Sequence, residues 1–181
     1  SRTVRCDGIN FNFLVIAKSI ESDGMDYRYH DSPLGSILIV GEGGCLHSLT
    51  LPTQRLDEWP LPDWQPTKTR YTDCVRQLDE YFDGKRQTFS LNLAPQGTPF
   101  QRQVWDALLQ IPYGVTRSYQ DIARAIGNPK AVRAVGGSNA RNPIAIVIPC
   151  HRVIGANGKL TGYAGGLKYK RALLDLERSS L

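Results

Sequence analysis

The sequence predicts a two-lobed α/β protein, with a small antiparallel sheet in the first lobe and mainly helices in the second. Its 181 residues, 41% hydrophobic and 22% charged, suffice for one compact unit or two small lobes. Strand patterns occur only before about residue 95, apart from one apolar run, and helical patterns dominate after it. Charge divides similarly: residues 117–181 contain 11 Lys and Arg against 3 Asp and Glu, whereas residues 1–116 contain 11 against 14.

The first lobe begins with apolar segments typical of strands. FNFLVIA (11–17) is much shorter than the roughly 20 apolar residues of a membrane span, so we expect a strand in a soluble protein. A turn at DSPLG (31–35) leads into SILIV, and CLHSLTL follows after GEGG. These segments predict a hairpin of two half-buried strands.

A Pro-rich loop, WPLPDWQP (59–66), separates this hairpin from a predicted helix that ends at Gly84. Four apolar residues recur at i, i+4, i+7 and i+11 and are predicted to share its buried face: Tyr71, Val75, Leu78 and Phe82. QTFSLNLAPQG (87–97) alternates apolar and polar residues, as an edge strand does, and then breaks at a proline and a glycine. We therefore predict domains at residues 1–94 and 95–181.

The four cysteines show no spacing typical of a disulfide framework or a zinc site. We expect three of them to be small buried hydrophobic residues: Cys6, Cys45 and Cys74. A zinc site that combined Cys45 and His47 with Cys6 or His30 would lack any CxxC or HxxxH pair, so no metal site is predicted.

The second lobe is predicted to contain three consecutive helices. TPFQRQVWDALLQIP (98–112) begins with a capping-box pattern and a proline at the first helical position, and SYQDIARAIG (118–127) begins with a second capping box. PKAVRAVGGSNA (129–140) follows at once. Two short helices joined by a tight Gly-Asn turn form a helix-turn-helix candidate, although an ordinary α-hairpin fits the same pattern.

The last of these helices carries one long cation, Arg133, among small residues that include Ala131, Ala134 and Gly136. Such a helix can pack closely on its own core, or it can lie in a narrow groove of DNA while Arg133 enters the base stack. It lacks the Asn, Gln and Arg array of a major-groove sequence reader, so the DNA alternative implies binding that is independent of sequence. The basic charge of the lobe fits a polyanionic partner or a solvated face equally well.

The apolar run NPIAIVIPCHRVIG (142–155) predicts a buried strand that ends at Pro149. Cys150 and His151 follow it, and a nearby imidazole with cationic surroundings can populate the reactive thiolate. Because neighbours on a strand face opposite ways, contact between the two needs a turn or a bridging water. Asn142 and Glu177, the latter on a final helix LKYKRALLDLE (167–177), are candidates for the same network. A buried structural cysteine remains the alternative.

These residues resemble the O6-alkylguanine-DNA alkyltransferase family, whose active-site signature is IPCHRV (148–153). The likeness runs from GTPFQRQVW through GKLTGYAGGLKYKRALLDLE, nearly all of the second lobe, and covers DSPLG and the following hairpin in the first. It implies an N-terminal RNase H-like α/β lobe and a C-terminal helical lobe that carries a minor-groove helix-turn-helix.

The resemblance also implies a DNA-repair activity, that of a methylated-DNA-[protein]-cysteine S-methyltransferase. Such a protein transfers an alkyl group from O6 of guanine, and from O4 of thymine, in duplex DNA to its own cysteine, once and irreversibly, after flipping the nucleotide. It needs no metal or organic cofactor, binds double-stranded DNA through the minor groove without sequence preference and has no membrane partner. We expect a monomer located in the cytoplasm, or in the nucleus of a eukaryote.

The resemblance assigns roles to the catalytic candidates. Cys150 would accept the alkyl group, activated through water by His151, while Glu177 orients the imidazole and Asn142 holds the turn. Tyr119 would push against the 3′ phosphate and help to protonate the departing guanine.

It assigns further roles in binding. Arg133 would fill the gap left by the flipped nucleotide, and the small residues Ala131, Ala134 and Gly136 would face the groove. The carbonyls of Cys150 and Val153 would accept from the guanine amine, and Tyr163 with Ala164 would line the O6 side of the pocket.

Two other classes of protein use similar elements. A non-catalytic lesion-binding relative would keep the groove helix but would lack Cys150. A transcriptional regulator would use the helix-turn-helix to read sequence, and the small-residue helix argues against that function.

Overall fold

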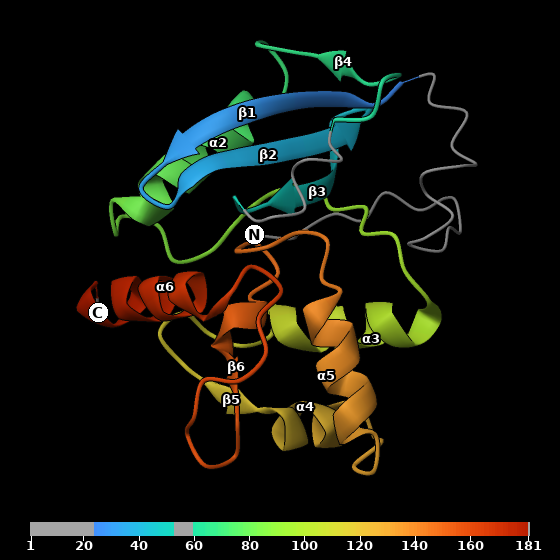
Figure 1. Cartoon of the computed structure of the whole chain (residues 1–181), viewed down its shortest axis with the longest axis vertical. Coiled ribbons are helices and arrows are strands. Elements are labelled where there is room, and N and C mark those ends of the chain that lie inside the picture. The colour runs from blue at the N-terminus through green and yellow to red at the C-terminus, as the bar shows by residue number, and fades with distance from the viewer. Residues whose placement is uncertain (1–23, 53–59, 181) are drawn as a thin grey trace. The chain divides into compact units, whose positions relative to one another are not determined.

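The computed structural model describes residues 24–52 and 60–180 and divides into two compact units, Ser1–Thr98 and Pro99–Leu181 (Figure 1). The predicted boundary at residues 94/95 lies in the segment just before this division. The strand expected at 11–17 lies outside the described residues. No helix in the described ranges is long and apolar enough to cross a membrane.

The described part of the first unit contains a four-stranded sheet in the order β3-β2-β1-β4 and the helix α2 (Figure 1). The strands β1, β2 and β3 pair antiparallel, and the short β4 pairs parallel with β1. The elements are, in chain order, β1 (Asp26–Ser32), β2 (Gly35–Glu42), β3 (Cys45–Thr50), β4 (Gln65–Pro66) and α2 (Thr72–Phe82). The predicted turn at 31–35 and the hairpin after it are confirmed, since Ser32 pairs with Gly35 and β2 pairs with β3.

Strand β2 is buried on both faces, not half-buried as expected. Leu38 and Val40 form a core cluster with Met25 and Trp64. Ile37 and Ile39, at the alternating positions of the same strand, are also fully buried. A run of consecutive β-branched and aliphatic residues fits a strand covered on both sides better than a half-exposed one.

Helix α2 forms where expected but buries a different face. Its buried residues are Cys74, Gln77, Leu78 and Tyr81. Tyr71, which the prediction placed in the buried stripe, is the residue before the helix and adopts a left-handed backbone conformation with φ of 59°. The prediction holds for Leu78, but Val75 and Phe82 are only partly buried, because the buried face is centred on Cys74, Leu78 and Tyr81 and includes the polar Gln77.

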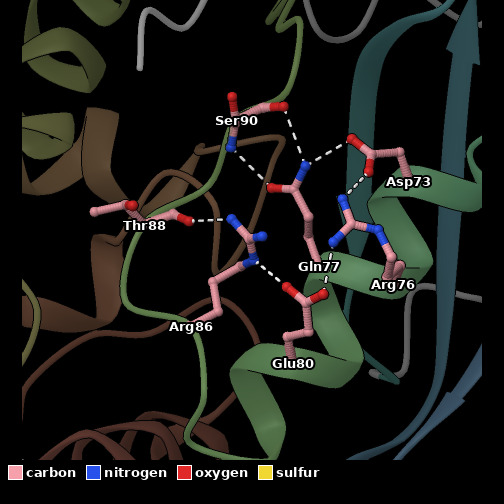
Figure 2. Close-up of polar contacts among 7 residues, drawn as sticks. All are labelled: Asp73, Arg76, Gln77, Glu80, Arg86, Thr88 and Ser90. Carbon is pink, nitrogen blue, oxygen red and sulfur yellow. Dashed lines mark hydrogen bonds and ion pairs between the residues drawn. The ribbon is translucent and has the colours of Figure 1, made fainter.

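Gln77 is buried because all of its polar atoms have partners (Figure 2). Its Nε2 donates to Asp73 Oδ2 (2.7 Å) and to the Ser90 carbonyl (3.1 Å), and its Oε1 accepts from the Ser90 amide (2.8 Å). Nearby, Arg86 donates to Glu80 (2.7 Å) and to the Thr88 carbonyl (2.8 Å). These contacts hold the segment that follows α2 against the helix.

The same contacts explain why residues 87–97 do not form the expected edge strand. Gln77 and Arg86 occupy the backbone groups of Ser90 and Thr88 that a ladder would use. The segment pairs with β3 at a single parallel bridge, Leu46 with Leu93. Gln77 of α2 and Arg86 just after it thus replace a neighbouring strand as hydrogen-bond partners of this segment.

The cysteines of this unit differ from one another. Cys74 is a buried free thiol, as predicted, and burial raises its pKa to about 12. Cys45 is disulfide-bonded, so the expectation of a plain buried hydrophobic residue was wrong for it. The spacing of cysteines along the chain could not reveal this, because a disulfide depends on distance in the fold.

The second unit is mainly helical (Figure 1). Its elements are α3 (Pro99–Leu109), β5 (Arg117–Ser118), α4 (Tyr119–Ala125), α5 (Val132–Ala140), the 3-10 helix η2 (Cys150–Arg152), β6 (Val153–Ile154) and α6 (Leu167–Ser179). Helices α3, α4 and α5 pack against one another, and Trp105 Nε1 donates across this core to the Ser138 carbonyl (2.9 Å).

Helices α4 and α5 form the predicted pair of short helices. The capping box of α4 is confirmed: the Ser118 hydroxyl accepts from the Asp121 amide, and the Asp121 carboxylate accepts from the Ser118 amide. Helix α5 begins at Val132, a few residues later than predicted. Gly127 supports the turn between them with φ of 74°.

Replacing Gln77 by Ala should lower the free energy of unfolding by about 1–3 kcal/mol, because the part-buried hydrogen bonds of the buried Gln77 side chain to the Ser90 amide and carbonyl are lost. Urea titration of wild type and variant measures this change. Arg76→Ala is the matched control, because Arg76 is exposed on the same helix and forms surface ion pairs, which contribute little to stability. Equal losses in the two variants would contradict the assignment.

Candidate active site

The site begins with a turn, not with the strand that the apolar run predicted. Residues 145–147 form a turn, with bends at 143 and 148, and Asn142 closes it: its Nδ2 donates to the carbonyls of Ile148 (2.8 Å) and Ile144 (3.4 Å). Its Oδ1 accepts from the Ile144 amide (3.0 Å). Ile146 adopts a left-handed φ of 70°, which is strained for a β-branched residue. The isoleucines of this segment are buried, as they would be in a core strand, so hydrophobicity alone could not distinguish a turn from a strand.

The turn leads directly into η2, which carries Cys150, His151 and Arg152. The chain then enters β6, which pairs parallel with β5 in the register Arg117 with Val153 and Ser118 with Ile154. Tyr119 follows β5 at once and opens α4. This short ladder therefore ties the start of α4 to the end of η2.

Helix α6 packs against η2 and supplies Glu177, which is fully buried. The His151 ring pairs with Glu177 Oε1 through Nε2 (2.7 Å). Arg152 donates from Nε to Oε2 (2.9 Å) and from Nη2 to Oε1 (3.0 Å), and its Nη1 donates to the Ile111 carbonyl (2.7 Å). The Gly114 amide also donates to Oε2 (3.0 Å). One carboxylate thus connects three separate segments of the chain.

The protonation of this network follows from its partners. Burial alone would raise the pKa of Glu177, but hydrogen bonds from His151 and Arg152 outweigh it and hold that pKa well below its ordinary value. Burial lowers the pKa of His151 against the opposing effect of Glu177, so the imidazole is neutral at pH 7. An ionised carboxylate can only accept, so the single ring proton lies on Nε2. Nδ1 is therefore the basic atom, and it is buried with no hydrogen-bond partner among the described residues.

Cys150 is a buried free thiol. Burial raises its pKa, while hydrogen bonds from Asn142 and Tyr163 and the positive charge of Lys170 act in the opposite direction. Its carbonyl accepts from Asn139 Nδ2 (3.3 Å). The thiol is thus protonated at neutral pH but lies among groups that favour its thiolate.

Tyr119 lies at the start of α4 beside α5. Its hydroxyl donates to the Thr161 carbonyl (3.0 Å), and a Cβ on Gly136 would lie 3.9 Å from its ring. Burial raises the pKa of this phenol, with a further increase from Cys150. Tyr119 therefore carries its proton at neutral pH.

The groove-facing candidates lie on the exposed side of α5. Arg133 and Ala134 are exposed, whereas Val135, Ser138 and Asn139 of the same helix are buried. Arg133 makes no hydrogen bond or ion pair with any other residue that the structure describes. Ala131 is the residue before the helix, and Gly136 is partly buried beside Tyr119.

The structure brings some predicted residues together and leaves others apart. Cys150 is brought together with Asn142 and Tyr163, and the neighbouring His151 is paired with Glu177. Val153 is buried in β6, and Ala164 is exposed in the loop before α6.

Sequence reasoning missed Lys170, Asn139 and the Gly114 amide. Lys170 could have been found, because it lies at the start of the helical stripe Lys170, Leu173, Leu174 and Glu177, all of which are buried. No local signal marks Gly114, since its contact with Glu177 spans 63 residues. Residues 24–52 and 60–180 contain no group of three or more His, Cys, Asp and Glu that could hold a metal ion.

Comparison with protein families identifies both units. Residues 99–179 match the model of the 6-O-methylguanine DNA methyltransferase DNA binding domain. Residues 25–95 match the model of the ribonuclease-like domain of the same methyltransferase.

Individual relatives match over most of their length. The methylated-DNA–protein-cysteine methyltransferase of Methanosarcina barkeri is 53% identical over 158 residues, which are 87% of this chain and 99% of that protein. The Mycobacterium tuberculosis protein of the same name is 51% identical, over 84% of this chain and 92% of its own. The crystal structure of M. tuberculosis OGT in complex with DNA superimposes with a TM-score of 0.81 at 50% identity, covering 86% of this chain and 94% of that one.

Replacing Glu177 by Gln should destabilise the protein by about 3–5 kcal/mol at pH 7, because Arg152 is left buried without its counter-charge. Asp175→Asn, at an exposed position of the same helix, is the control and should change the free energy of unfolding little. Denaturant titration of both variants measures the difference.

The stability difference between wild type and Glu177→Gln should depend on pH. Since the pKa of Glu177 is lowered by folding, the unfolded chain takes up a proton first as pH falls below the ordinary value of 4.5, and the stabilisation is lost there. His151, whose pKa is also lowered, adds a loss of stability below its ordinary 6.5 in the wild type. The gap between wild type and Glu177→Gln should therefore be widest above pH 4.5 and narrow below it. A constant gap would show that Glu177 is not ionised in the folded protein.

Proposed function

The chain belongs to the 6-O-methylguanine DNA methyltransferase family, and on that premise we propose that Cys150 is the acceptor to which it transfers the alkyl group. The protein is a DNA-repair methyltransferase that moves an alkyl group from DNA to its own cysteine. One observation carries the assignment of the acceptor: Cys150 lies next to a neutral histidine whose bare Nδ1 is buried and without a partner.

The reaction follows from these protonation states. The Cys150 proton passes through a bridging water to Nδ1 of His151, and the resulting imidazolium is stabilised by Glu177. The sulfur then attacks the O6-alkyl carbon, a carbon–sulfur bond forms, and the carbon–oxygen bond breaks with its electron pair left on guanine. Tyr119 supplies a proton to the departing base, since it holds its own at neutral pH.

The product explains single use. A thioether on Cys150 is a poor leaving group, and no described residue of the site is an activated nucleophile that could remove the alkyl group. Side chains supply every group that the step needs, so we propose that no metal or organic cofactor takes part. The same site accepts alkyl groups from O4 of thymine by the same displacement.

We propose that the duplex binds through its minor groove to the exposed side of α5. The small side chains of Ala131, Ala134 and Gly136 allow close approach, and Arg133 is free to enter the stack in place of the flipped nucleotide. None of these residues offers a base-specific pattern, so binding is independent of sequence. One chain carries one acceptor, and it acts as a monomer.

The pocket for the extruded base is proposed to lie at the residues around the thiol. The carbonyls of Cys150 and Val153 accept from the exocyclic amine, and Tyr163 and Ala164 line the O6 side. Tyr163 is already a partner of Cys150 in the free protein. This places the alkyl carbon within reach of the sulfur.

Mixing the protein with duplex DNA that contains O6-methylguanine should add one methyl group to each chain, at Cys150, as read by intact and peptide mass. Cys150→Ser should show no transfer and should still bind the duplex, because the hydroxyl is a much weaker nucleophile than a thiolate while the binding surface is intact. A Cys74→Ser variant is the matched control, since Cys74 is the other free cysteine in the described ranges. Methyl transfer to Cys150→Ser would remove Cys150 from its role, and no transfer to wild type would leave a lesion-binding or regulatory protein.

Replacing Arg133 by Ala should slow methyl transfer from duplex DNA by tenfold or more, while transfer from free O6-methylguanine base changes little. The free base needs no extrusion, so it tests the pocket alone. Single-turnover rates with the two substrates measure the contrast. Equal slowing with both would mean that Arg133 supports the fold or the pocket instead.

A further inference from the structure

Helix α6 buries a lysine in its core stripe. Lys170 is fully buried, with Leu173, Leu174 and Glu177, on the face that packs toward η2. Lysine is almost never fully buried unless it is paired. Its position in this helix therefore needs an explanation beyond packing.

Lys170 has no carboxylate within ion-pair distance in the part of the chain that the structure describes. Its Nζ donates to the Thr161 carbonyl (2.8 Å) and lies 5.9 Å from the centroid of the Tyr119 ring. The one buried carboxylate of the site, Glu177, is already paired with Arg152 and His151. The resting site thus holds one positive charge in excess.

The groups around Lys170 are those of the reaction. Its positive charge acts on Cys150 and on His151, both on η2, and its Nζ shares the Thr161 carbonyl with the Tyr119 hydroxyl of α4. Glu177 lies two turns further along its own helix, and Tyr163 contacts the same thiol. Of the neutral acids among these groups, Cys150 is the easier to ionise, because the ordinary pKa of a thiol is 9.0 and that of the Tyr119 phenol is 10.0.

We propose that Lys170 is a positioning residue for the transfer reaction: its ammonium group provides the counter-charge for the Cys150 thiolate and holds the Thr161 carbonyl that orients the Tyr119 hydroxyl. This inference rests on the proposed role of Cys150 as the acceptor. Forming the thiolate balances the excess charge, and once the alkyl group has moved, the same ammonium faces the negative charge that appears on guanine. Lys170 therefore stabilises first the attacking Cys150 thiolate and then the departing guanine anion.

The pH dependence of the site supports this role. Burial lowers the pKa of Lys170 to about 8, against the opposing effect of Cys150. Above this pH the ammonium loses its charge, so its support for the thiolate disappears. Because the unfolded chain holds this proton up to its ordinary 10.5, the charged lysine lowers stability below pH 8, and this loss is relieved as pH rises toward 10.5.

The first test uses Lys170→Met, which keeps the length of the side chain and removes its charge, and Lys170→Arg, which keeps the charge. The rate of alkylation by iodoacetamide at Cys150, located by peptide mass and followed against pH, reports the titration of the thiol without DNA. We expect the midpoint to rise by about one unit in Lys170→Met, a tenfold loss of thiolate at pH 7.5, and to shift less in Lys170→Arg. Lys168→Met, at an exposed position of the same helix, is the matched control and should leave the midpoint unchanged. An unchanged midpoint in a folded Lys170→Met protein overturns the proposal.

Two further measurements separate this role from a structural one. Lys170→Met should melt at the wild-type temperature or higher, although its single-turnover transfer from free O6-methylguanine should be about tenfold slower at pH 7.5. In the wild type, the rise of that transfer rate with pH should become shallower near pH 8, where Lys170 loses its proton, and this change of slope should be missing in Lys170→Met. A wild-type profile with no change of slope near pH 8 overturns the proposal even if Lys170→Met does not fold. If wild type transfers no alkyl group at all, the proposed function fails, while the iodoacetamide titration still decides the coupling of Lys170 to Cys150.

Discussion

The buried carboxylate of Glu177 is the interaction on which the rest of the second unit depends. It accepts from His151, from Arg152 and from the Gly114 amide, so helix α6, the 3-10 helix η2 and the loop after α3 meet at two oxygen atoms. Gly114 can present its amide there because glycine tolerates its φ of 71°. An isolated carboxylate could not be ionised in such a place, but four donors stabilise the charge. The ionised form in turn decides which nitrogen of His151 carries the proton.

In this arrangement the Cys150 thiol is protonated at neutral pH and is therefore a weak nucleophile. Burial keeps Cys150 protonated, and a protonated thiol is protected from oxidation and from stray electrophiles. The groups that favour the thiolate are nevertheless already in place, held by the turn that Asn142 closes and by the left-handed Ile146 within it. Strain of this kind persists only where the surrounding contacts enforce it, and here the enforced conformation presents the sulfur at the end of a rigid turn.

Stability and reactivity conflict at the same helix. A leucine in place of Lys170 would complete an apolar stripe on α6, whereas the lysine leaves a buried charge with no carboxylate partner among the described residues. Buried charges of this kind commonly lower stability and are found where the chemistry requires them. Glu177 at the other end of the stripe shows the opposite case, a buried charge whose partners are complete.

The amino-acid sequence by itself determined the local features of this protein. The capping box of α4, the turn at residues 31–35 and the helix α6 depend on neighbours within a few residues, so pattern and chemistry were enough to place them. The motif around Cys150 likewise identified the family, because its residues are contiguous.

Local pattern failed where distant groups intervene. The buried run at 143–148 has the composition of a strand, but Asn142 folds it into turns, and residues 87–97 have the alternation of a strand, but Gln77 and Arg86 take their backbone groups. Only the tertiary structure could decide the protonation of His151 and the partners of Glu177, because each depends on which segments far apart in the chain exclude water from the same place.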